Sequence, residues 1–437
     1  MGSYVPSTPA EREKMLAALG VTSPRALYDN VPQSMFVGPL PLEPGRSELE
    51  VAAVMAAYAG ANKIYKSIFR GAGAYDHYIP AIVKSVTSKE EFLTAYTPYQ
   101  AEISQGVLQS IFEYQTQMCE LTGMDVSNAS VYDGASAAAE SVAMCAERRR
   151  RRAVICGSCA PMVIETVRTY CFGSDTPLDV APVKEGCTDK EALAALLGDE
   201  TACVIAPYTN YFGLIEDVRA LAELVHGAGA KLVLFCEPIS LGILETPGAL
   251  GADVAVGEGQ PLGLPLSFGG PYLGFMTTKR EMMRRLPGRI VGETTDAAGR
   301  RAFVLTLQAR EQHLRREKAS SNICSNEALC AMTASAYLAA MGPGGLAEAA
   351  RQCAAKAHAL AARLCALDGF SLAYKGEFFN EFVTVSRGAR ALCENLERGD
   401  ILPGLPLSDT EILWCCTEKN TRADIDALVA AIKEASK

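Results

Sequence analysis

Residues 202–236, ACVIAPYTNYFGLIEDVRALAELVHGAGAKLVLFC, decide the fold class. Residues 202–206 and 232–235 are apolar runs typical of buried strands, and the segment between them has the apolar spacing of a helix. A strand, a helix and a strand in this order predict a βαβ unit, and therefore a mainly parallel, right-handed sheet covered on both faces. Ligands bind such sheets at the carboxyl ends of the strands. We therefore predict a site around residues 207–210 and 236–237.

The rest of the chain divides into three parts. Residues 1–45 contain a short capped helix and a loop rich in proline and glycine, which indicates an N-terminal arm. Residues 46–341 alternate between strands and helices, and we expect them to form a large α/β domain. Gly342-Pro343-Gly344-Gly345 breaks the chain, and the shorter elements of 342–437 predict a smaller C-terminal α+β domain.

Capping residues mark several helix ends. Thr8 with Glu11 predicts the start of the first helix, and the stretch 188–191, Thr-Asp-Lys-Glu, predicts another capping box. A helix that opens at Asp133 is predicted to end in the arginine run 148–152, since cations stabilise helix C-termini.

Composition and charge restrict the function. The chain has 41 Lys and Arg against 50 Asp and Glu, so its net charge of -9 repels phosphate backbones, and we expect no nucleic-acid partner. Its 15 cysteines are an odd number spread over a long chain without a signal-like start, which favours reduced thiols and a cytoplasmic location. No apolar run reaches the length of about 18 residues that spans a membrane, so we expect no membrane association.

Two short motifs are candidates for chemistry. Asp133-Gly134-Ala135-Ser136 at a helix start offers backbone N–H groups and a hydroxyl that suit a phosphate, and ordinary helix capping gives the same pattern. The stretch 156–159, Cys-Gly-Ser-Cys, has the spacing of a zinc knuckle or a redox pair. No second Cys or His pair lies at the spacing of a zinc finger, and the four histidines are scattered. We interpret these cysteines as structural and predict no metal site.

Two polar stretches are candidates for ligand contact. Tyr96-Thr-Pro-Tyr99-Gln100 joins aromatic and hydrogen-bonding side chains in a segment too irregular for a core, and a rigid turn with buried tyrosines is the alternative. Residues 320–326 form a polar cluster before an apolar helix, and the alternative there is a helix cap.

Nearly the whole chain resembles one family, the α subunit of the glycine cleavage system P-protein, which is glycine dehydrogenase (decarboxylating) subunit 1. The resemblance rests on several long motifs. They are GAGAYDHYIP (71–80), AYTPYQAEISQG (95–106), ELTGMD (120–125), VYDGA (131–135), GEG (257–259), SFGGPYLGF (267–275), PGRIVGE (287–293), LTLQ (305–308) and REKASSNIC (316–324).

The resemblance implies the fold of pyridoxal-phosphate enzymes of the aspartate aminotransferase type (fold type I). Such enzymes need a lysine that forms a Schiff base with the cofactor, and usually an acid beside the pyridine nitrogen. Glu237 ends a strand where that acid would sit, yet residues 232–278 contain no lysine. Lys279 follows an apolar run and is best explained as a charged strand end. We therefore interpret the chain as the subunit without the Schiff-base lysine, and assign it no catalytic residue and no cofactor-binding residue.

The resemblance also implies partners. A homologous β subunit would carry pyridoxal phosphate on its own lysine in an α2β2 assembly, which decarboxylates glycine and passes the aminomethyl group to the lipoyl arm of the H-protein. In this chain Tyr96 and Tyr99, and then Ser321 and Asn322, are our candidates for residues that reach the shared site as aromatic walls and hydrogen-bonding groups. The helix start at Gly134 would be the remnant of a phosphate site.

Two other functions stay open from the sequence. A self-sufficient pyridoxal-phosphate lyase or aminotransferase would need a lysine brought in by the tertiary structure, and Lys279 and Lys318 are the candidates. A non-catalytic scaffold for the β subunit would need none of the polar loops.

Overall fold

A computed structural model describes residues 6–38, 40–323 and 325–435. Residues 1–5 of the predicted arm and Cys324 of the polar cluster lie outside the described residues. The chain forms two compact units, Met1–Ile64 and Tyr65–Lys437. None of the described helices combines the length and the apolar character needed to cross a bilayer.

The N-terminal unit contains two capped helices. Helix α1 (Pro9–Ala18) begins after Thr8, whose hydroxyl accepts the N–H of Glu11 while the Glu11 carboxylate accepts the N–H of Thr8. This confirms the predicted capping box. Helix α2 (Glu48–Gly60) begins after Ser47 with the same arrangement to Glu50.

A seven-stranded sheet forms the centre of the second unit, in the order β2-β10-β9-β8-β7-β3-β4. Strands β4, β3, β7, β8 and β9 run parallel, and β10 is antiparallel to β9 and β2. Helix α9 (Val218–Gly227) connects β7 to β8, so the βαβ prediction is confirmed. The strands are β2 (Val126–Ser127), β3 (Arg152–Cys156), β4 (Leu178–Ala181), β7 (Thr201–Pro207), β8 (Lys231–Cys236), β9 (Val254–Glu258) and β10 (Gly274–Thr278).

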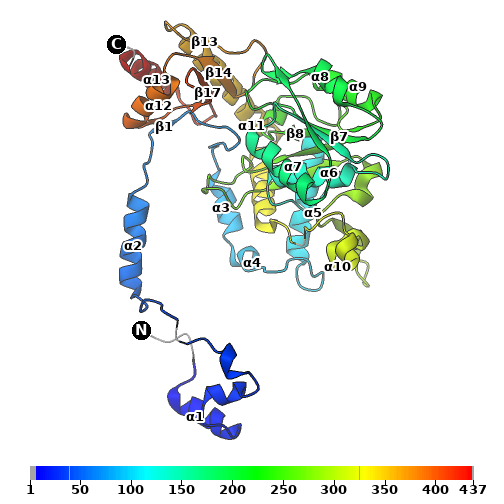
Figure 1. The fold of residues 1–437 in the computed structure, drawn as a ribbon, viewed down its shortest axis with the longest axis vertical. Helices are drawn as coiled ribbons and strands as arrows, with labels where there is room; N and C mark the ends of the chain where they lie inside the picture. Colours follow the sequence, from blue (N-terminus) through cyan, green and yellow to red (C-terminus); the bar gives the residue numbers. More distant parts are fainter. Residues whose placement is uncertain (1–5, 39, 324, 436–437) are drawn as a thin grey trace. The chain divides into compact units, whose positions relative to one another are not determined.

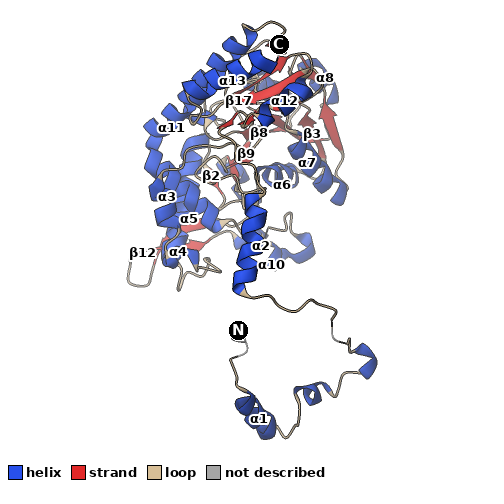
Figure 2. Ribbon diagram, turned by 90° about the vertical axis from the view of Figure 1, so that its left-hand side faces the viewer, coloured by secondary structure: helices blue, strands red, loops and turns tan. Residues whose placement is uncertain are grey.

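Helices cover both faces of this sheet (Figure 1). In the second view, helices α7 and α11 lie on opposite sides of the sheet (Figure 2). The strands β7 and β8 are buried along almost their whole length, and their apolar side chains belong to the core. The helices of this part are α3 (Ala81–Thr87), α4 (Glu90–Leu93), α5 (Gln105–Thr122), α6 (Gly134–Cys145), α7 (Pro161–Gly173), α8 (Lys190–Leu196), α10 (Gln312–Arg315) and α11 (Ala328–Cys365).

The predicted end of α6 was wrong. The helix ends at Cys145, and the arginine run does not extend it. Arg150 instead donates to the carbonyls of Thr201, the first residue of β7, and of Ala228, in the loop before β8. This arginine of the run therefore satisfies two backbone carbonyls and does not stabilise the end of a helix.

The capping box predicted at Thr188 was also wrong. Asp189 caps α8 and accepts the N–H groups of Glu191 and Ala192. Thr188 belongs to the short strand β6 (Cys187–Thr188), and both its N–H and its hydroxyl donate to Glu216. A buried carboxylate far along the chain thus competes successfully with the local cap.

A second core lies around Trp414 in the C-terminal part. There, β13, β14, β17 and β16 form an antiparallel sheet, with α12 and α13 beside it (Figure 1). Helix α11 is interrupted at Gly342, which has a φ of 61°, close to the predicted break. These elements are β13 (Ser371–Leu372), β14 (Glu381–Val385), α12 (Ala389–Arg398), β15 (Ile401–Leu402), β16 (Leu405–Pro406), β17 (Glu411–Cys415) and α13 (Arg422–Ala435).

Three pairs of short strands complete the fold. Strand β1 (Ser67–Ile68) pairs with β15, β5 (Val183–Lys184) with β6, and β11 (Val291–Thr295) with β12 (Arg301–Leu305). The β1 pairing ties the start of the second unit to its C-terminal part, and the loop that follows β1 then enters the site.

Candidate functional site

A cavity of about 470 Å³ opens at the carboxyl ends of β7 and β8. Its walls include Pro207 and Asn210 after β7, and Cys236 and Glu237 after β8, so the predicted position of a ligand site coincides with a cavity. The other walls come from the loop after β1, the starts of α6 and α7, the segment after β9, and Glu381 of β14. This volume is in the range of small-molecule sites.

Glu237 supplies the carboxylate at the end of the central strand. One of its oxygens accepts the N–H of Ile239 at 3.0 Å, and the other accepts the N–H of Ser240 at 2.6 Å. Burial raises the pKa of Glu237, while the charge of His77 and these two N–H groups lower it. The expected acid is therefore present at this position.

Glu258 closes the start of helix α6. Its Oε2 accepts the N–H of Gly134 at 2.9 Å, and its Oε1 accepts the N–H groups of Gln260 and Leu273 at 2.9 and 3.0 Å. A Cβ on Gly134 would lie 2.6 Å from the backbone nitrogen of Glu258, so only glycine allows this close approach. Burial raises the pKa of Glu258 against the lowering effect of the three hydrogen bonds.

Asp133 takes a second set of donors at the same helix start. Its carboxylate accepts the N–H of Ser136 at 2.7 Å and the Ser136 hydroxyl at 3.1 Å. The helix start thus carries two internal carboxylates, and the capping interpretation of the stretch 133–136 describes it better than a free phosphate site.

Glu381 enters the cavity from the C-terminal sheet. It accepts the N–H of Ala72 at 2.6 Å and the hydroxyl of Tyr75 at 2.7 Å, so it holds the loop after β1 in place. Burial raises the pKa of Glu381 to about 7, and the charge of Glu237 adds to this.

The residues of this cavity do not fit pyridoxal phosphate. Among the described residues that line it there is no lysine, arginine or histidine, and Pro261 stands in the wall after β9. A phosphate needs N–H donors or cations, and Gly134 and Ser136 already donate to carboxylates. A Schiff base needs a lysine.

The two lysines that could have supplied a Schiff base lie elsewhere. Lys279 follows β10 and donates to Asp253 at 3.1 Å, which agrees with a charged strand end. Lys318 is exposed in a short 3-10 helix, Arg316–Lys318. Neither lines the cavity.

The candidate tyrosines lie outside the cavity. Tyr96 is 94% exposed in the loop before α5. Tyr99 is half-buried, its hydroxyl accepts the N–H of Asn326 at 2.9 Å, and the guanidinium of Arg289 lies 5.5 Å from its ring centre. Of these two tyrosines, Tyr96 therefore presents almost its whole side chain to the solvent.

The second polar stretch lies against the first. Asn326, which binds Tyr99, also donates to the carbonyl of Ser130 at 2.6 Å. The Ser321 hydroxyl accepts the N–H of Ile323 and hydrogen-bonds to Glu140 on α6, whereas Asn322 is exposed. Burial raises the pKa of Glu140 to about 7, and the bond to Ser321 lowers it. The structure thus brings the two stretches together, but neither reaches the cavity.

Sequence reasoning missed Asp133, Glu258 and Glu381 as a group around the cavity. Glu258 lay within a recognised motif, and its place directly after a strand was a usable signal. The sequence around Glu381 contained no such signal, because its partner Tyr75 is 306 residues away in the chain.

The architecture defines the class. The fold is that of pyridoxal-phosphate-dependent enzymes of fold type I. Solved structures with this fold include a NifS-like protein from Rickettsia africae, with a TM-score of 0.61 and 14% identity over 86% of this chain and 99% of that one. At this identity the likeness concerns the fold alone.

The family is shown by closer relatives. The family model for the glycine cleavage system P-protein matches residues 2–432, and the chain belongs to this family. It is 49% identical to a probable glycine dehydrogenase (decarboxylating) subunit 1 from Moorella thermoacetica, over 99% of each chain. It is also similar to a crystal structure of glycine decarboxylase (P-protein) in inhibitor-bound form, with a TM-score of 0.93 and 39% identity over 99% of this chain and 100% of that one.

Proposed function

We propose that this chain, a subunit of the glycine-decarboxylating P-protein, binds no pyridoxal phosphate itself and completes an active site shared with a homologous β subunit. The β subunit would carry the cofactor on its own lysine. One observation carries this proposal: the cavity that corresponds to a cofactor site has no lysine in its described lining, and its helix start is filled by Glu258.

The reaction decarboxylates glycine, and the aminomethyl group passes to the lipoyl arm of the H-protein. The cofactor on the β subunit supplies the electron sink for this chemistry. This chain's part is to line the shared site with Tyr96, Tyr99, Ser321 and Asn322, which orient the substrate and exclude water. The exposure of Tyr96 and Asn322 supports this part, because exposed side chains are accessible to a partner.

An α2β2 assembly in the cytoplasm completes the proposal. Among the described cysteines no disulfide is formed, and most of these thiols are buried, which supports a reducing compartment. A self-sufficient pyridoxal-phosphate enzyme is disfavoured by the ion pair that holds Lys279 to Asp253, outside the cavity.

Borohydride reduction tests where the cofactor is held. The purified chain, alone and assembled with the β subunit, is incubated with pyridoxal phosphate, reduced with borohydride and examined by peptide mass spectrometry. We expect pyridoxyl-lysine on the β subunit alone, and glycine decarboxylation only when both chains are present. Stoichiometric label on one lysine of this chain would make it an independent pyridoxal-phosphate enzyme.

Substitution of Tyr96 tests the shared site. We expect Tyr96→Ala in the assembled enzyme to lower kcat/KM for glycine decarboxylation about tenfold or more, since an aromatic wall and a hydrogen bond to substrate are lost. The thermal stability of this chain should not change, because Tyr96 is almost fully exposed. The measurement is steady-state decarboxylation together with a thermal melt.

Two variants control this experiment. Phe172→Ala removes another exposed aromatic, at the end of α7 away from the cavity, and should leave turnover unchanged. Tyr99→Phe removes the acceptor of the Asn326 N–H and should destabilise the chain by about 1 kcal/mol. Normal turnover of Tyr96→Ala in a fully assembled enzyme would favour the scaffold function instead.

A further inference from the structure

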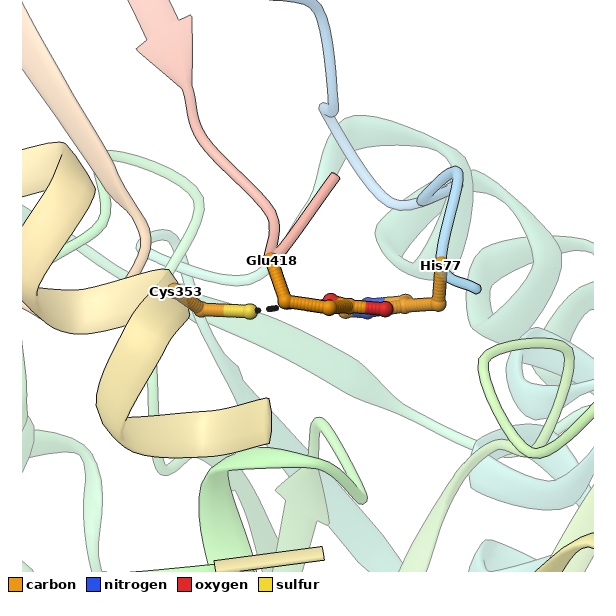
Figure 3. Close-up of side chains that lie close together, drawn as sticks. All are labelled: His77, Cys353 and Glu418. Carbon is orange, nitrogen blue, oxygen red and sulfur yellow. Dashed lines mark hydrogen bonds and ion pairs between the residues drawn. The ribbon is translucent and has the colours of Figure 1, made fainter. Parts of the chain in front are cut away.

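Three side chains of metal-ligating type meet in the protein interior, each from a different segment. His77 comes from the loop after β1, Cys353 from α11 and Glu418 from the turn between β17 and α13. Their ligand atoms lie within 4.8 Å of one another, and no other such group of three occurs in the described part of the chain. Figure 3 shows the Glu418 carboxylate between the other two side chains.

The contacts within this group are short. The Glu418 Oε2 lies 2.7 Å from His77 Nδ1 and 3.4 Å from Cys353 Sγ, whose thiol donates to it. The His77 side chain is 2% exposed and that of Glu418 is 14% exposed. A nitrogen, a sulfur and an oxygen atom are therefore gathered around one point in the protein interior.

Two buried polar atoms beside this group have no partner among the described residues. They are Nε2 of His77 and the hydroxyl of Tyr337, a residue that is fully buried. Burial raises the pKa of Tyr337, and the charges of Glu418 and Cys353 add to this. Buried polar atoms without partners are uncommon, and an unplaced ion or water is one of their usual causes.

The charge around the group also favours a cation. Glu237 and Glu418 are close enough to repel each other, and Glu381 adds a third carboxylate. Positive charge comes from Lys356, which donates to the backbone carbonyl of Glu418, and from His77 when it is protonated. A divalent ion held by Glu418 would lower the repulsion between Glu418 and Glu237.

We propose that His77, Cys353 and Glu418 form a binding site for a divalent transition metal ion, with zinc as the best match. One imidazole, one thiolate and one carboxylate are zinc ligands, whereas calcium and magnesium take oxygen ligands alone. Zinc binding releases one proton from the site. The thiol proton of Cys353 leaves to solvent, and the ring proton of His77 moves from Nδ1 to Nε2, so the dication, the thiolate and the carboxylate sum to zero charge. The fourth position takes water, as in sites with three protein ligands.

The site joins three segments that are distant in the chain. Its role is structural: the ion would fix the loop after β1, whose residues Gly73 and Tyr75 line the cavity, to α11 and to the turn after β17. Sequence motifs do not reveal this metal site, because no two of its ligands are closer than 65 residues in the chain.

Metal content tests the proposal on the full chain assembled with its β subunit. The protein is stripped with a chelator, loaded with zinc alone and dialysed, and zinc per chain is measured by plasma mass spectrometry. We expect one ion per chain in the wild type, and at least a hundredfold weaker retention in Cys353→Ser. Cys393→Ser is the matched control, since Cys393 is also buried and its thiol donates only to the Gly404 carbonyl.

A spectroscopic measurement covers the case in which a variant fails to fold. Wild-type protein loaded with cobalt should show a thiolate-to-metal charge-transfer band, and X-ray absorption at the zinc edge should show one sulfur among nitrogen and oxygen neighbours. Absence of retained zinc in the wild type, equal zinc in Cys353→Ser, or a zinc shell without sulfur would each overturn the proposal. None of these readouts depends on glycine decarboxylation, so they stand apart from the proposed function.

Discussion

Replacing Glu258 with alanine is expected to lower the free energy of unfolding by about 3–5 kcal/mol. The substitution leaves the N–H groups of Gly134, Gln260 and Leu273 without an acceptor, and all three residues are buried. Each such group costs about 1–3 kcal/mol, and entry of water from the cavity offsets part of the sum. Urea unfolding followed by fluorescence of Trp414, the only tryptophan, measures the change.

Two variants calibrate this result. Glu258→Gln keeps an oxygen for Gln260 and Leu273 but not for Gly134, so we expect roughly a third of the loss. Glu223→Ala, at an exposed position on α9, should change the unfolding free energy by less than about 0.5 kcal/mol. If Glu258→Ala unfolds at the same urea concentration as the wild type, the carboxylate does not hold the start of α6.

Glu381→Gln is expected to stabilise the chain at pH 8 by about 3 kcal/mol and to have no effect near pH 4.5. Burial raises the pKa of Glu381 to about 7 in the folded chain, from 4.5 as its ordinary value. The folded state therefore binds this proton more tightly than the unfolded state. The resulting stability is fully present below about pH 4.5 and is lost as the pH rises through 7.

The glutamine keeps the contacts of the protonated acid. Its oxygen accepts the N–H of Ala72 and its amide donates to the Tyr75 hydroxyl. Unfolding free energies of both proteins are measured by urea at several values between pH 4.5 and 8. The contribution of Glu140, whose pKa is also about 7, is present in both and cancels. Parallel pH profiles for the two proteins would show that folding does not raise the pKa of Glu381.

Much of the fold could be predicted because its central elements carry strong local signals. The apolar runs of β7 and β8, with the amphipathic α9 between them, are typical of a buried parallel unit. Helix α12, which buries Cys393 and Leu396, was not predicted. Thr188 and Arg150 were misassigned because their hydrogen-bond partners lie 28 and 51 residues further along the chain.

The position of the site was predictable, whereas its chemistry was only partly so. Carboxyl ends of parallel strands converge, so the residues after β7 and β8 located the cavity in advance. The absence of lysine between 232 and 278 was also visible in the sequence. The hydrogen bond by which Glu258 occupies the start of α6 could not be predicted from the sequence. It depends on the tertiary structure, which brings Glu258 to Gly134 across 124 residues. The roles of Tyr96, Tyr99, Ser321 and Asn322 remain predictions, since all four lie outside the cavity.

The internal carboxylate at the start of α6 also bears on how this lineage can change. If lysine alone replaced Pro261, Glu258 would still occupy the start of α6, where a phosphate would have to bind. A single mutation that removed Glu258 would weaken folding before any cofactor was gained. Neither change alone would therefore create a phosphate site, whereas the two together would remove the carboxylate and supply a lysine. The hydrogen bonds that hold the start of α6 thus also oppose the gain of a cofactor in this cavity.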